Sequence, residues 1–154
     1  MSESIVIYSP QINPEDKMFR QWSLQPDSGN INEIPLLLST LKVSPDTHPR
    51  VCDLCAGDGA VSTILVSNGW LPENITCIDF YKPADNLAQG SKWLYLDLRL
   101  LAQYIKLGTP IPPEIEALKG TFDFTILVRG MLRDQEQEAV CKYFTREGGF
   151  YANL

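Results

Sequence analysis

Short apolar runs alternate with segments of helical periodicity along most of the chain. The runs at 50–54, 74–80, 92–96, 122–128 and 149–153 have the length and composition of strands that are buried on both faces. Segments 32–41, 60–68, 97–107, 114–118 and 134–144 are expected to be helices. Strands that alternate with helices in this way are typical of α/β proteins. We therefore expect a three-layer sandwich, in which helices cover a mostly parallel sheet of about five strands.

Glycine, proline and acidic residues mark the ends of several of these segments. Asn68-Gly69 and Gly108 each follow an apolar periodic stretch, where a residue with a left-handed backbone commonly ends a helix. Asp134 is the expected N-cap of the last helix, and Gly148-Gly149 are expected to form a turn into the fifth strand.

The first thirty residues differ from the rest of the chain. They are polar, contain three prolines, and carry isolated large side chains at Phe19 and Trp22. We interpret residues 1–30 as an arm that either docks these two aromatic side chains on the core or closes as a lid over a ligand. Residues 31–154 are expected to form a single domain.

Composition limits the class of protein. The 154 residues are 44% hydrophobic, which is enough to build a globular core. A formal net charge of −6 disfavours broad binding to nucleic acid or to anionic membranes, because both require a basic field. The sequence shows no apolar run near the roughly 18 residues of a membrane span and no signal peptide. We expect a soluble cytoplasmic protein.

The four cysteines include one C-x-x-C pair, formed by Cys52 and Cys55. A zinc ribbon would need a second close pair, but Cys77 and Cys141 are far apart and His48 is the only histidine. We interpret all four as ordinary reduced thiols, mostly buried, and expect no metal site.

The segment from Val51 to Gly59 has the sequence of a strand, loop and helix start that bind a ligand. An apolar run is interrupted by the acidic Asp53 and leads to two glycines, Gly57 and Gly59. Glycine allows a ligand to approach the backbone closely, and the first turn of a helix offers N–H donors. A dinucleotide fingerprint would need a third glycine where this chain has Ser62.

Two further acidic residues lie at the carboxyl ends of predicted strands, Asp79 at the end of the second and Asp97 after the third. The carboxyl ends of parallel strands form the edge at which open α/β sheets bind ligands. Each acid also has a structural interpretation. Asp53 could brace the glycine loop, Asp79 could simply end its strand, and Asp97 could cap the helix that follows.

The loop resembles the first motif of class I S-adenosylmethionine-dependent methyltransferases, Asp/Glu-x-Gly-x-Gly-x-Gly. Asp53, Gly57 and Gly59 match the motif, and Cys55 stands where its first glycine is usual. The resemblance extends to the acids after the second and third strands, to Phe122-Asp123 before the fourth, and to the turn at 144–150. It implies a Rossmann-like fold with S-adenosylmethionine as cofactor.

The resemblance also implies roles for individual residues. In the family, the acid at the position of Asp79 binds both ribose hydroxyls of the cofactor. The acid at Asp97 accepts from the adenine amino group, while the next backbone N–H, that of Leu98, serves a ring nitrogen. Asp53 lies near the methionine end of the cofactor, and Arg129 follows the fourth strand, where substrate contacts are usual. No catalytic base is identified.

The sequence departs from the family pattern after the fifth strand. The family sheet has seven strands, and this sequence matches only the first five, so we expect a sheet without the sixth and seventh. The open edge of the fifth strand predicts a second copy or a partner protein there, unless the N-terminal arm covers it. The leading hypothesis is a methyltransferase of unidentified substrate. The alternatives are an inactive methyltransferase-like binding or regulatory protein and, disfavoured by Ser62, a nucleotide-dependent oxidoreductase.

Overall fold

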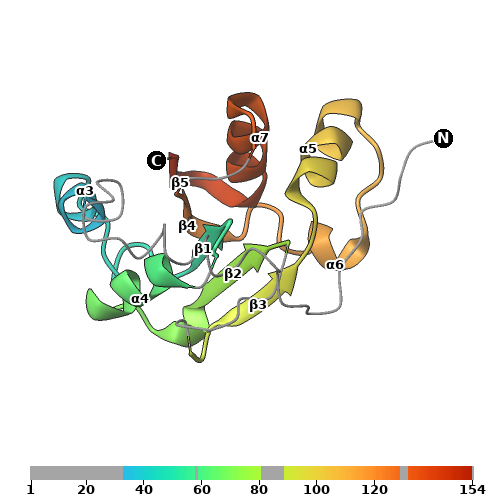
Figure 1. Ribbon diagram of the computed structural model, residues 1–154. Coiled ribbons are helices and arrows are strands. Elements are labelled where there is room, and N and C mark those ends of the chain that lie inside the picture. Colours follow the sequence, from blue (N-terminus) through green and yellow to red (C-terminus); the bar gives the residue numbers. More distant parts are fainter. Residues whose placement is uncertain (1–32, 58, 81–88, 129–131, 154) are drawn as a thin grey trace.

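The computed structural model describes residues 33–57, 59–80, 89–128 and 132–153, and these form a five-stranded sheet with helices on both faces (Figure 1). The strands are β1 (Val51–Leu54), β2 (Ile75–Asp79), β3 (Lys92–Tyr95), β4 (Phe122–Leu127) and β5 (Thr145–Asn153). Their order across the sheet is β3-β2-β1-β4-β5, and every neighbouring pair is parallel. The predicted α/β class is confirmed, and this sheet is parallel throughout.

The helices divide between the two faces of the sheet (Figure 1). They are α3 (Ile34–Thr40), α4 (Ala60–Ser67), the short 3-10 helix η1 (Pro72–Asn74), α5 (Leu98–Leu107), α6 (Pro113–Glu116) and α7 (Asp134–Phe144). Helices α3 and α4 pack on one face, and α5, α6 and α7 pack on the other. Each predicted helix is present, with its ends shifted by a few residues at most.

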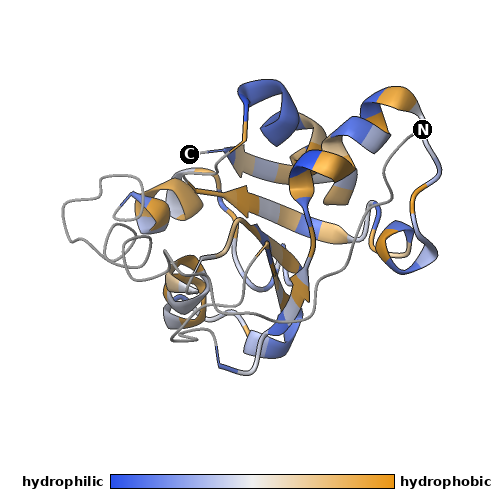
Figure 2. Cartoon of the chain, turned by 45° about the vertical axis from the view of Figure 1, so that its right-hand side comes forward, coloured by the Kyte–Doolittle hydropathy of each residue, from blue (hydrophilic) through white to orange (hydrophobic). Residues whose placement is uncertain are grey.

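Each face of the sheet has its own apolar core. Leu101, Ile115 and Phe144 lie on the α5, α6 and α7 side and are fully buried there. Ile34 and Leu65 are fully buried on the opposite side, under α3 and α4. Figure 2 shows that apolar residues predominate in the strands between the two helical layers. Burial on both faces explains why the strands appear in the sequence as nearly continuous apolar runs.

The strand order opens a crevice at the carboxyl edge of the sheet, where a ligand can bind. The chain proceeds outward from β1 to β2 and β3, and then returns to add β4 and β5 on the other side of β1. Connections therefore leave the carboxyl ends of β1 and β4 in opposite directions, which opens a crevice at that edge. The glycine loop follows β1 directly at this point.

The start of β5 differs from the prediction. The strand begins at Thr145, directly after α7, and the expected glycine turn lies inside it. Thr145 pairs with Phe122, yet the next pair joins Phe150 to Phe124, so β5 bulges between these pairs. A Cβ at Gly149 would lie 2.8 Å from the carbonyl oxygen of Asp123. The glycines therefore serve a bulge that packs against β4, and not a turn before the strand.

The beginning of α7 also differs. Arg133, and not Asp134, occupies the N-cap position. The backbone N–H of Arg133 donates to Oε1 of Glu136 at 2.8 Å, which ties the N-cap residue to the first turn. Asp134 lies in that first turn, where its negative charge is favourable next to the helix N-terminus.

Some predictions fall outside the described residues, namely the arm at residues 1–30 with Phe19 and Trp22, and the substrate residue Arg129. Within the described part, no helix has both the length and the apolar character needed to cross a bilayer. Strands β3 and β5 form the two edges of the described sheet. Pairing of a second copy or a partner along β5 stays a prediction.

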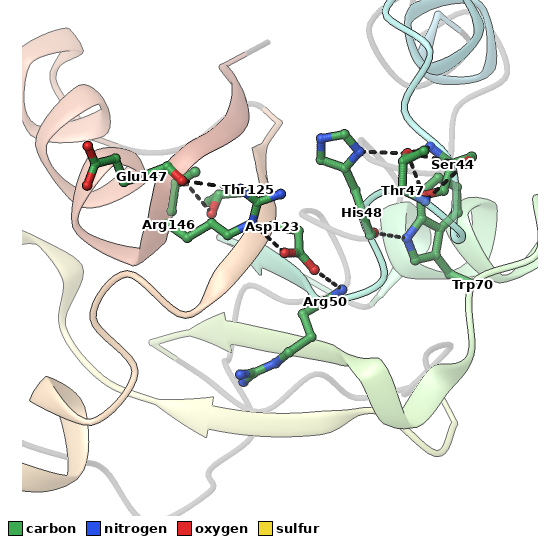
Figure 3. Close-up of polar contacts among 10 residues, drawn as sticks. Ser44, Thr47, His48, Arg50, Trp70, Asp123, Thr125, Arg146 and Glu147 are labelled. Carbon is green, nitrogen blue, oxygen red and sulfur yellow. Dashed lines mark hydrogen bonds and ion pairs between the residues drawn. The ribbon is translucent and has the colours of Figure 1, made fainter.

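Asp123 joins three strands at the amino edge of the sheet, opposite the glycine loop (Figure 3). Its Oδ2 accepts from the backbone N–H of Arg50 at 2.9 Å, and its Oδ1 accepts from Nε of Arg146 at 2.6 Å. Partial burial alone would raise the pKa of Asp123, but these two hydrogen bonds and the charge of Arg146 bring it below its ordinary value. The starts of β1, β4 and β5 are thereby tied together.

We expect Asp123→Asn to lower the free energy of unfolding by about 1 kcal/mol at pH 7. Because the folded-state pKa of Asp123 is lowered, its contribution is present above the unfolded value of about 4 and is lost as pH falls through the folded value. Urea denaturation at pH 7 and pH 3 should show the difference from wild type shrinking at the lower pH. An equal difference at both pH values, or a similar loss in the exposed Asp46→Asn control, would contradict this assignment.

Candidate functional site

The loop after β1 is built from residues with left-handed backbone angles. Cys55 has a φ of 55°, Gly57 of 61° and Gly59 of 93°. Gly59 is the N-cap residue of α4, so the loop leads directly into the first turn of that helix. Glycine adopts positive φ at no steric cost, which explains its presence at two of these three positions.

Cys55 is the exception among the three. A residue with a Cβ is strained in the left-handed region by roughly 1–2 kcal/mol. The Cys55 side chain is half-buried and packs against the core on the α5 side of the sheet, which offsets part of that cost. The methyltransferase motif that the loop resembles usually has glycine at this position. The positive φ of Cys55 gives the physical reason, because glycine adopts such an angle without strain.

Asp79 connects the loop to the end of β2. Its Oδ2 accepts from the backbone N–H of Gly57 at 2.7 Å, and its Oδ1 accepts from the N–H of Phe80 at 2.6 Å. The N–H of Ala56 donates to the carbonyl oxygen of Ile78 at 3.2 Å, which adds a second link between loop and strand. The carboxylate is half-buried and held in one place by two backbone donors.

Asp53 lies deeper, between the sheet and α4. Its carboxylate is 1% exposed, and Oδ2 accepts from the hydroxyl of Ser62 at 2.7 Å. The Ser62 oxygen lies 3.2 Å from Sγ of Cys77. Burial and the nearby Asp53 charge raise the pKa of the Cys77 thiol well above its ordinary value. Asp53 is thus a buried brace between β1 and α4.

Asp97 caps helix α5. Its Oδ1 accepts from the backbone N–H groups of Arg99 at 2.9 Å and Leu100 at 3.3 Å. Leu98 is the first residue of the helix. Its backbone N–H is therefore one of the first four N–H groups, which have no acceptor within the helix. The capping interpretation of Asp97 is confirmed; a ligand role for Asp97 and Leu98 stays a prediction.

These residues lie along one edge of the sheet, on consecutive strands. The N–H of Leu96 donates to the carbonyl oxygen of Asp79 at 3.0 Å, which joins the end of β3 to the end of β2. The loop after β1, Asp79 after β2 and Asp97 after β3 therefore follow one another along this edge. Direct contact is made between the loop and Asp79.

Tyr95 is a neighbour of the site that sequence analysis did not identify. It pairs with Asp79 in the parallel register of β2 and β3, so the two side chains leave the same face of the sheet. Burial raises the pKa of Tyr95, and the nearby Asp79 carboxylate raises it further. Only the pairing register brings Tyr95 beside Asp79, since the two residues are far apart in the sequence.

The cysteines lie as expected for structural thiols. Cys52, Cys77 and Cys141 are buried, and Cys55 is half-buried. Burial raises the pKa of Cys52 well above its ordinary value and that of Cys141 to about 12, so these thiols are protonated at neutral pH. Among the residues that the structure describes, no group of three or more His, Cys, Asp or Glu side chains is placed to hold a metal ion.

Comparison with known proteins shows the fold. No protein-family model matches the chain, and no curated protein matches it. A crystal structure of the PH0226 protein from Pyrococcus horikoshii OT3 superimposes with a TM-score of 0.56 at 18% sequence identity. The match covers 92% of this chain and 66% of that chain, so this chain spans just under two thirds of its length. The Rossmann-like α/β architecture is common to both.

The strain at Cys55 predicts that a glycine variant at this position is more stable than a valine variant. Cys55→Gly removes side-chain packing but also removes the strain, so we expect the free energy of unfolding to stay within about 1 kcal/mol of wild type. Cys55→Val is also apolar but branches at Cβ, and should lower it by about 1–3 kcal/mol. Chemical denaturation measures both. A glycine variant less stable than the valine variant would show that the left-handed backbone at Cys55 is not a constraint.

Proposed function

We propose that the chain binds S-adenosylmethionine at the carboxyl edge of β1, β2 and β3 and acts as a methyltransferase. The observation that supports this most strongly is the Asp79 carboxylate, held 2.7 Å from the Gly57 N–H where the glycine loop meets the end of β2. An acid fixed at this junction is suited to bind the ribose of a ligand that passes over the loop.

The chemistry of a carboxylate matches a vicinal diol. Its two oxygens offer about four acceptor sites, and both lie at the junction of the loop and β2. Two adjacent hydroxyl groups match the two oxygens of such a carboxylate. Charge-assisted bonds of this kind are about twice as strong as neutral ones.

The chain that follows β3 supplies groups that can bind a purine ring. Asp97 offers a carboxylate acceptor, and Leu98 offers an N–H in the first turn of α5. A carboxylate beside a backbone N–H complements an amino group beside a ring nitrogen, as in adenine. Because Oδ1 of Asp97 is engaged in capping, we assign the purine contact to its second oxygen.

Methyl transfer requires alignment more than acid–base chemistry. The methyl group of a sulfonium is displaced in line by a nucleophile, and the protein has to hold both partners in that line. The substrate would approach over the end of β4, where the chain continues into Arg129.

A second candidate is a protein that binds the same ligand for assembly or regulation, without chemistry. It is favoured by the position of His48, the only histidine of the sequence, which precedes β1 at the opposite edge. The Nδ1 atom of His48 lies 2.8 Å from the Thr47 hydroxyl, and its carbonyl oxygen accepts from Nε1 of Trp70 at 2.8 Å (Figure 3). This histidine therefore belongs to a structural turn.

Titration calorimetry with S-adenosylhomocysteine tests the proposal. We expect binding to the wild-type chain, and Asp79→Ala should weaken it by about 2–4 kcal/mol because both ribose acceptors are lost. Asp46→Ala is the matched control, since it makes the same change of charge at an exposed position before β1. The ligand should also raise the melting temperature of the wild type by mass action.

Two results would contradict the proposal. The first is no heat of binding and no thermal shift with folded wild-type protein at millimolar ligand. The second is an equal loss of affinity in the Asp79 and Asp46 variants, which would remove Asp79 from the site. Transfer of a labelled methyl group to cell extract then separates the methyltransferase from the binding protein.

A further inference from the structure

Strand β3 forms one edge of the described sheet (Figure 1). It pairs with β2 without a shift in register, and η1 is its other main neighbour. Among the residues that the structure describes, no strand lies beyond it. An edge strand directs part of its backbone N–H and C=O groups away from the sheet, where a further strand can bond to them. The edge of β3 is therefore a regular template for one more strand.

Two polar side-chain atoms at β3 are buried and lack a hydrogen-bond partner within the described part of the chain. They are Oγ of Ser91 and Nε1 of Trp93. Both residues are only half-buried as a whole, so the burial is concentrated on these atoms. A buried donor without an acceptor is destabilising, and folded proteins supply a partner for most such groups. A segment that lies beside β3 and offers acceptors removes this penalty.

Both atoms belong to the face of the sheet on which α3 and α4 pack. Trp93 pairs with Cys77 in register and packs against the apolar cluster on that face. Ser91 lies two residues earlier, so strand alternation directs it to the same side. The Trp93 ring stacks on that of Tyr95 with centroids 6.0 Å apart. Helix α4 connects β1 to β2, whereas the described part of the connection from β2 to β3 contains no helix.

The N-terminal arm contains one segment with the composition of a strand. Residues 5–8 have the sequence Ile-Val-Ile-Tyr and lie between two serines, with Pro10 shortly after them. Residues that branch at Cβ and aromatic residues favour strands. Residues 9–32, which join this segment to the start of α3, span up to about 80 Å when extended. This length is several times the radius of gyration of about 14 Å for a domain of this size, so the segment can reach β3 of its own chain.

The other edge of the sheet, β5, is less suited to an added strand. It bulges between the pair Phe122–Thr145 and the pair Phe124–Phe150. Bulges of this kind protect an edge strand from pairing with further strands. In addition, no buried side-chain atom of the described β5 residues lacks a hydrogen-bond partner. Both observations favour β3.

We propose that residues 5–8 pair along the open edge of β3 as an additional strand, so that the chain covers this edge of its own sheet. The arm then continues across the face that carries Trp93 and Tyr95, and its carbonyl groups accept from Ser91 Oγ and Trp93 Nε1. The inference is independent of the proposed function, because it concerns how the sheet is completed and needs no ligand.

The first test uses the wild-type chain. Amide hydrogen exchange, followed by nuclear magnetic resonance, should show that the β3 amides not bonded to β2 exchange at least about tenfold more slowly than the exposed turn amide of Gly90. Exchange as fast as that of Gly90 would overturn the inference. Light scattering should give a monomer mass under the same conditions. Protection that appears only together with a dimer mass would assign the edge to a second copy and overturn it as well.

The second test disrupts the segment within the full chain. Successive residues of a strand direct their N–H groups to opposite sides, so Val6→Pro/Ile7→Pro removes a donor that faces β3 in either register. We expect the protected β3 edge amides and the Trp93 indole N–H to exchange at least about tenfold faster, with the amides of β1 and β4 unchanged. Asp27→Pro/Ser28→Pro is the matched control, since it places two prolines in the arm outside the segment. It should leave β3 exchange as in wild type.

Three results of the second test would overturn the inference: unchanged β3 exchange in Val6→Pro/Ile7→Pro, an equal acceleration in the control, or an acceleration at the β5 amides in place of β3. If the proline variant does not fold, Val6→Gly/Ile7→Gly replaces it, because glycine lowers strand propensity without a steric clash. The same acceleration at β3 is expected there, and its absence counts against the proposal in the same way.

Discussion

The hydrogen bond from the Gly57 N–H to the Asp79 carboxylate organises the edge of the sheet where we place the ligand. It joins the turn after β1 to the end of β2, and together with the bond from the Phe80 N–H it holds the Asp79 carboxylate in place. Gly57 makes this bond with a left-handed backbone, which glycine adopts at no steric cost. The order of the strands, with β1 and β2 adjacent, brings the two partners together.

The three acids at this edge have different physical environments, although they look alike in the sequence. Asp53 is buried and held by Ser62, Asp79 is half-buried between two backbone donors, and Asp97 caps a helix. Burial determines what each can do. Asp79 is suited to bind hydroxyl groups directly, whereas Asp53 is a buried brace between β1 and α4.

Local sequence signals predicted the sheet and the helices because strands buried on both faces appear as apolar runs. They misplaced the start of β5, because Thr145 joins the sheet by pairing with Phe122 on β4 and the Arg146 side chain bonds to that of Asp123. The Asp97 cap was among the predicted alternatives, since capping depends on neighbouring residues. The bond between Gly57 and Asp79 and the pairing of Tyr95 with Asp79 depend on register between strands, which no local pattern contains.

The central claim is that the ligand binds at the carboxyl edge around Gly57 and Asp79. It is tested most directly by recording backbone amide signals by nuclear magnetic resonance while S-adenosylhomocysteine is added. The account predicts shifts in the amides of Gly57, Phe80 and Leu98, with those of Arg50 and Asp123 at the opposite edge unchanged. Shifts confined to the opposite edge, or a Gly57 signal that does not move at saturating ligand, would contradict it.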